Sequence, residues 1–121
     1  MNTSKWIVAG LGALMLGLTQ LAVAHALPKQ QTPVAGAEVS PAPKEVRILF
    51  DDDLEPAFST ITVTDVAGKQ VSSTKAAVDA HNKKLMKVAL PVLAAGSYKV
   101  RWAAVADDGH RTQGYYSFKV K

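Results

Sequence analysis

The sequence contains no cysteine, and this absence excludes several kinds of site. Domains stapled by disulfides, thiolate metal centres and enzymes with a cysteine nucleophile all need this residue. Aromatic residues are also scarce, at 7%. The 14 basic and 10 acidic residues are scattered along the chain, whereas a nucleic-acid-binding surface needs a basic face with aromatic residues between the charges. The sequence therefore predicts no nucleic-acid partner and a fold held by its hydrophobic core alone.

Long apolar runs are absent too, except for one near the N-terminus. Lys5 precedes a mostly apolar stretch, residues 6–18, which is short for a membrane span. Ala22 and Ala24 fit the small-residue rule for cleavage of a secretory signal. We expect residues 1–24 to be a signal peptide cleaved before His25, with an uncleaved membrane anchor as the alternative. Residues 25–121 would then form one periplasmic domain without a membrane span.

The rest of the chain has short segments with strand character and no long helical pattern. Four prolines between residues 25 and 44 predict an extended arm with at most a short edge strand, because proline lacks the amide donor of a central strand. Residues 76–84 fit either a loop or a helical turn. Strands are predicted at 46–50, 58–64, 69–74, 85–90, 98–102 and 115–120. About seven short strands, counting the arm, predict an all-β, immunoglobulin-like Greek-key sandwich.

Alternation within these strands also predicts which large side chains are buried. Trp102, Tyr115 and Tyr116 are expected in the core of the sandwich. Met86 is the one methionine in the central part of the chain, and we expect it to fill a gap in the core. His81 lies beside Asn82 and two lysines, so it is expected on a surface loop.

Asp108 and His110 form the first candidate metal-binding pair. They are separated by one residue, and on extended backbone such residues point to the same side. A carboxylate beside an imidazole suits a divalent metal. Asp-Asp-Gly is also ordinary turn chemistry, so a solvated turn is the alternative interpretation.

His25 gains a second ligand if the signal peptide is removed before it. Its α-amino group would be free, with a reference pKa of about 7.7–8.0. The amine and Nδ1 of one histidine can chelate an ion through a six-membered ring. With the His110 imidazole they would make a three-nitrogen, T-shaped set that leaves a fourth position for carboxylate or water. Such tetragonal coordination favours Cu(II); the alternative is that a histidine follows the cleavage site by chance.

Several segments of the sequence resemble the CopC family of periplasmic copper-binding proteins. The resemblance lies in residues 93–102, 106–110 and 114–120, and in the opening of the chain at Thr32-Pro33, Gly36-Ala37-Glu38, 46–50 and 54–59. It covers essentially the whole of the expected mature chain. It implies a small Greek-key sandwich that binds one Cu(II) ion per chain. The implied ligands are His25, through amine and imidazole, Asp108 and His110.

The family resemblance implies two further features of the copper site. A further acidic ligand follows the early strand in some members; here Asp52 is the best-aligned residue and Asp51 the alternative, while a solvated loop is the other interpretation. Some members also bind Cu(I) through a methionine-rich segment. The corresponding stretch, residues 65–86, holds only Met86. Because Cu(I) prefers thioether ligands, no Cu(I) site is expected.

The favoured hypothesis is a monomeric periplasmic Cu(II) carrier or buffer in copper resistance or homeostasis, and not an enzyme. The family implies a membrane copper transporter or an outer-membrane copper protein as its partner. One alternative is a copper-dependent oxidative enzyme with a histidine brace, built on His25 and His110. The other is a metal-free, immunoglobulin-like interaction domain.

Overall fold

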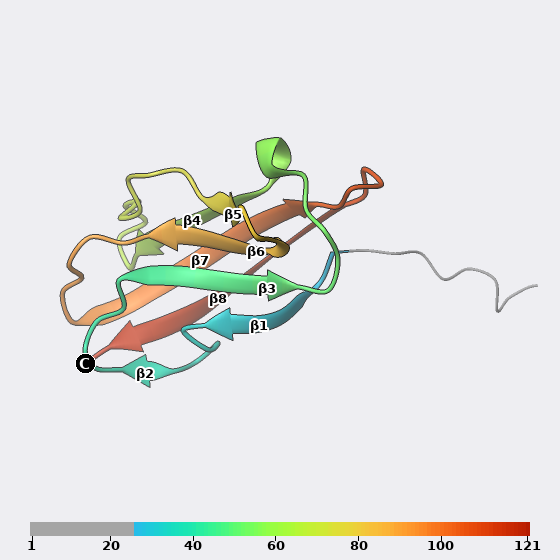
Figure 1. Ribbon diagram of the computed structural model, residues 1–121. Helices are drawn as coiled ribbons and strands as arrows, with labels where there is room; N and C mark the ends of the chain where they lie inside the picture. Colours follow the sequence, from blue (N-terminus) through green and yellow to red (C-terminus); the bar gives the residue numbers. More distant parts are fainter. Residues whose placement is uncertain (1–25) are drawn as a thin grey trace, which may run out of the picture.

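The computed structural model describes residues 26–121 (Figure 1), so the expected signal peptide, its cleavage site and His25 lie outside the described residues. No helix in the described range is long and apolar enough to cross a membrane. The elements follow in the order β1 (Pro28–Thr32), β2 (Glu38–Val39), β3 (Glu45–Phe50), the 3-10 helix η1 (Pro56–Phe58), β4 (Thr60–Asp65), β5 (Ala77–Asp79), β6 (Asn82–Ala89), β7 (Gly96–Val105) and β8 (Arg111–Val120).

The strands form two four-stranded sheets that pack face to face (Figure 1). One sheet has the order β1-β3-β6-β5 and the other the order β2-β8-β7-β4. All neighbours are antiparallel except β2 and β8, which run parallel. The predicted all-β sandwich is confirmed, with the two-residue β2 and the three-residue β5 as additional short strands. Both strands of the proline-rich arm, β1 and β2, lie at sheet edges, as the prolines predict.

Alternation along the strands builds the core, because successive side chains point to opposite faces of a sheet. Phe50 contacts Trp102 edge to face, with ring centroids 5.3 Å apart, and Tyr98 stacks on Phe118 at 5.6 Å. Met86 is fully buried, as predicted. The other buried strand residues are Val46, Ile48, Ile61, Val63, Val88, Val100, Ala104, Tyr116 and Val120.

The strand predicted at residues 69–74 is wrong. This segment runs along the free edge of β4 and forms only an isolated bridge, between Gln70 and Thr64, with further contacts through Val71 and Ser72. The Val71 amide donates to the Val63 carbonyl at 2.8 Å, and the Val63 amide donates to Ser72 Oγ at 3.0 Å. The buried Ser72 hydroxyl thus takes the place of a strand carbonyl, and the segment covers part of an edge that would otherwise be open.

Residues 76–84, expected as a loop or helical turn, form β5, a tight turn and the start of β6. Asp79 fixes the turn, since its carboxylate accepts from the His81 amide at 2.9 Å and lies 3.2 Å from Lys87 Nζ. These two contacts lower the pKa of Asp79. His81 is exposed at the tip of the turn, as the sequence predicts.

Two neighbouring tyrosines on β8 have opposite environments. Tyr116 is buried and Tyr115 is 68% exposed, so the prediction that both lie in the core is wrong for Tyr115. Strand alternation is the reason, because adjacent residues cannot face the same side of a sheet. Burial raises the pKa of Tyr116, and within the described residues its hydroxyl has no hydrogen-bond partner.

Candidate metal centre

Three segments that are far apart in the sequence meet at one end of the sandwich (Figure 1). They are the start of the described chain at residues 26–27, the loop after β3 at residues 51–54, and the turn between β7 and β8 at residues 107–110. The loop and the turn are joined by a bridge between Leu54 and Ala106, and by the Asp107 amide, which donates to the Asp53 carbonyl at 3.2 Å. Every predicted metal ligand inside the described range belongs to one of these segments.

Asp108 and His110 contact each other in the β7–β8 turn. The Asp108 carboxylate lies 3.0 Å from His110 Nδ1, and its other oxygen accepts from the His110 amide at 3.0 Å. Both side chains are about half exposed, at 43% and 51%. An ion could therefore reach the imidazole and the carboxylate from solvent. The structure brings this predicted pair together.

The turn, and not an extended strand, is what places the pair on one side. The Gly109 amide donates to the Ala106 carbonyl at 2.8 Å, and the Ala106 amide donates to the His110 carbonyl at 2.9 Å. Gly109 has a φ of 90°, a conformation that residues with a Cβ rarely adopt. The expectation of extended backbone is wrong here, because Asp-Asp-Gly forms the turn for which its residue types are suited.

The start of the described chain is anchored beside this turn. Ala26 is fully buried, and its carbonyl accepts a hydrogen bond of 2.6 Å from the Thr112 hydroxyl. Leu27 and Asp51 make a reciprocal pair, in which the Leu27 amide donates to Asp51 Oδ1 at 2.8 Å and the Asp51 amide donates to the Leu27 carbonyl at 3.0 Å. Thr112 follows His110 by two residues, so the anchor connects the chain start directly to the turn.

Sequence reasoning missed Thr112. Thr112 is 86 residues away from Ala26 in the sequence, and no local sequence pattern predicts a single hydrogen bond from a threonine hydroxyl to a distant carbonyl. Asp51 was an alternative metal ligand, but its carboxylate already holds the Leu27 amide. The contact of Asp51 with the chain start does have a sequence signal, because Asp51 directly follows a strand that pairs with the arm.

Asp52 is half-buried, and its Oδ1 accepts from the Asp53 amide at 2.8 Å. Within residues 26–121, no three side chains among histidine, aspartate and glutamate gather into a group that could hold a metal ion. The structure does not test whether Asp52 adds to such a site, so this stays a prediction.

Trp102 lies in the core near the same end of the sandwich. Its ring packs against Phe50, the residue before Asp51, and it is only 8% exposed. Its indole also covers Gly114, where an added Cβ would come within 2.7 Å of the ring. A larger residue at position 114 would therefore force the indole or the strand to shift.

Comparison with known proteins identifies the family to which the chain belongs. Residues 28–121 match the CopC domain. The chain is 33% identical over 117 residues to copper resistance protein C of Escherichia coli, covering 91% of this chain and 92% of that protein. It is 32% identical to protein YobA of Escherichia coli K12, covering 99% and 98%.

A solved structure agrees with these sequence relatives. The crystal structure of CopC from Methylosinus trichosporium OB3b superposes with a TM-score of 0.76 at 34% identity, covering 80% of this chain and 94% of that one. The residues that match the CopC domain, 28–121, include all eight strands and the β7–β8 turn. On this evidence the chain belongs to the CopC family.

Proposed function

We propose that the protein is a Cu(II)-binding carrier or buffer of the periplasm, exported with residues 1–24 as a cleaved signal peptide. It binds one Cu(II) ion through His25, Asp108 and His110, and Asp52 is the candidate for a further carboxylate ligand. Relatives named for copper resistance support copper as the metal. The proposal places the protein in copper resistance or homeostasis.

One observation carries this proposal: the hydrogen bond of Thr112 to the Ala26 carbonyl. Thr112 is two residues from His110, and His25 is bonded directly to Ala26. The chain start is therefore held within reach of the Asp108–His110 pair. A site assembled in this way takes one set of ligands from the first residue of the mature chain and the other set from the β7–β8 turn.

The chemistry of this donor set fits Cu(II). A free amine and two imidazoles supply nitrogen ligands, and a carboxylate supplies oxygen, in the tetragonal arrangement that Cu(II) prefers. The imidazoles and the amine must lose their protons to bind, so acid should weaken the site. The contact between Asp108 and His110 also orients the ring before an ion arrives.

The test measures Cu(II) affinity in the exported protein and in four variants. Asp108→Asn, His110→Gln and a chain with one alanine added before His25 should each bind Cu(II) at least tenfold more weakly, while His81→Gln serves as the control and should bind normally. Trp102 is the only tryptophan outside the expected signal peptide, so quenching of its fluorescence reports binding.

Electron paramagnetic resonance of the Cu(II) form adds the ligand type. Coupling to three nitrogens is expected in the exported protein and should be lost when a residue precedes His25. Unchanged affinity in both the Asp108 and His110 variants would overturn the site. Mass spectrometry of the exported protein establishes its first residue, and a mature protein that starts elsewhere would overturn the role of His25.

A further inference from the structure

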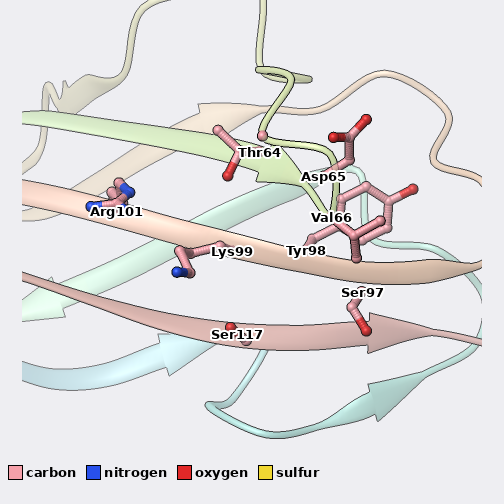
Figure 2. Close-up of a pocket in the computed structure, with 9 residues that line it drawn as sticks. Thr64, Asp65, Val66, Ser97, Tyr98, Lys99, Arg101 and Ser117 are labelled. Carbon is pink, nitrogen blue, oxygen red and sulfur yellow. The ribbon is translucent and has the colours of Figure 1, made fainter.

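The outer surface of the sheet β2-β8-β7-β4 carries unusual side chains at its centre. We call this surface the β7–β8 face and define it by Thr62, Thr64, Lys99, Arg101, Tyr115 and Ser117. These residues are cross-strand neighbours, because Arg101 pairs with Thr62 and Tyr115, and Lys99 pairs with Thr64 and Ser117. Figure 2 shows Lys99 and Arg101 side by side along β7, between Thr64 of β4 and Ser117 of β8.

In the described part of the chain, the two cations of this face form no ion pair with an acid, whereas two cations of the opposite sheet do. There Arg47 lies 3.5 Å from Glu45, and Lys87 lies 3.2 Å from Asp79. Among the described residues, no carboxylate forms an ion pair with Lys99 or Arg101.

Asp65 lines the same hollow as Lys99 and Arg101, but its carboxylate is engaged elsewhere. One of its carboxylate oxygens accepts from the Ala67 and Lys69 amides at 2.9 Å each. It therefore stabilises its own turn. The centre of the β7–β8 face carries positive charge that the fold does not neutralise.

Tyr115 gives this face an aromatic centre. Its ring is 68% exposed, with Lys99 Nζ at 5.0 Å and Arg101 Cζ at 5.9 Å from the ring centroid. The cations rest against the ring and are held on the face by it. Tyrosine and arginine are the residue types that dominate binding energy at protein interfaces. Open hollows lie on both sides of Arg101, one toward Val66 and one toward Gln113.

We propose that the β7–β8 face docks an acidic segment of a partner protein. Carboxylates of the partner would pair with Lys99 and Arg101, and an extended segment would hydrogen-bond to the threonine and serine hydroxyls between them. A membrane surface fits less well, since lipid recognition uses clusters of four to eight cations. Neutral hydroxyls that alternate with two cations match a protein surface.

The position of this face relates it to the proposed copper site, and in this respect the inference rests on the proposed function. β8 begins directly after His110, and Tyr115 lies five residues along the strand, a distance of roughly 17 Å. A partner docked on the face would therefore have the metal end of the sandwich beside it. The partner would be one that receives or delivers the ion.

The test uses the metal-free, isotopically labelled exported protein and a short synthetic peptide of alternating glutamate and threonine. Amide shifts should concentrate at the outward positions of β4, β7 and β8 and should weaken as salt is added. The double variant K99E/R101E should bind the peptide roughly tenfold more weakly. K29E/K44E changes the same charge at exposed lysines elsewhere and should bind as the parent does.

Three results would overturn the docking proposal. The first is that the peptide causes no amide shifts, or causes shifts near lysines over the whole surface. The second is that both double variants lose the same amount of affinity for the peptide. The third is that phosphatidylglycerol vesicles bind this face while the peptide does not. Cu(II) affinity of K99E/R101E should equal that of the parent protein. If the parent fails to bind Cu(II) while the peptide still binds this face, the proposed function falls and the docking face stands.

Discussion

Thr112 is the residue that ties the start of the described chain to the β7–β8 hairpin. Two residues along the chain from His110, its hydroxyl holds the carbonyl of the fully buried Ala26. Its importance could not be predicted from sequence, because the two residues meet only once both sheets have formed. By contrast, His25, Asp108 and His110 could be named from their chemical types and from the family resemblance.

We predict that Thr112→Val weakens Cu(II) binding although it removes no ligand. A lost hydrogen bond of this kind costs about 1 kcal/mol, and the freed chain start would have to be ordered again by the metal. The expected result is an affinity about fivefold lower by Trp102 quenching. Thr112→Ser keeps the hydroxyl and should bind almost normally. Equal affinities for the valine and serine variants would contradict the anchor.

Strands with clear alternation were the most predictable elements. Val46, Ile48 and Phe50 alternate with polar or less buried residues, and β3 forms where they stand. The segment 69–74 is mostly polar, with Val71 as its one apolar residue, and it lies along an edge, where Ser72 offers a side-chain acceptor and only Gln70 pairs with β4. The lysine-rich start of β6 shows no alternation, because its first residues face solvent on both sides.

Strand β8 gives a prediction based on its two adjacent tyrosines. Burial raises the pKa of Tyr116, so the folded state holds the phenol proton more tightly than the unfolded chain, where tyrosine titrates at about 10. The contribution of this difference to the free energy of unfolding is complete below that pH and is lost as the pH rises above it. Tyr116→Phe should therefore lose less stability in alkali than the parent.

Urea unfolding at pH 7 and near pH 11 checks the Tyr116 prediction. At pH 7, Tyr116→Phe should match the parent or exceed it by about 1 kcal/mol, since it removes a buried hydroxyl without a partner. Tyr115→Phe is the matched control, because Tyr115 is exposed and should leave the pH dependence unchanged. A similar alkaline loss in all three proteins would contradict the role of burial.

At the scale of the whole molecule, fold and family agree with the expectations from sequence. Membership of the CopC family confirms the resemblance, and the family includes relatives named for copper resistance. The sandwich holds together through one core without disulfides. Three expectations rest on residue chemistry and on the family resemblance alone: the partner, the exact ligand set and the export of the protein. The experiments proposed for the copper site and the docking face test them.

Copper should stabilise the folded protein as a whole, because the proposed ligands come together only in the folded chain. A ligand present at about 100 times its Kd contributes about 2.7 kcal/mol. For a domain of this size we expect Tm to rise by roughly 10–20 °C. The chain with an alanine before His25 should show the same metal-free Tm, since Ala26 and its anchor are intact, and a much smaller rise with Cu(II). Equal rises in scanning calorimetry would contradict the proposed amine ligand.

The final strand carries the chain away from the metal-binding turn. β8 begins beside His110 and continues for ten residues to Val120, which places the C-terminus at the opposite end of the sandwich, roughly 30 Å away (Figure 1). A fusion, a dye or a surface tether added after Lys121 would therefore leave the end with the proposed copper site facing outward. When every molecule on a sensor chip is immobilised through this C-terminal tag, all of them present the same end to metal and partner. A tag at the other terminus would block the proposed amine ligand of His25.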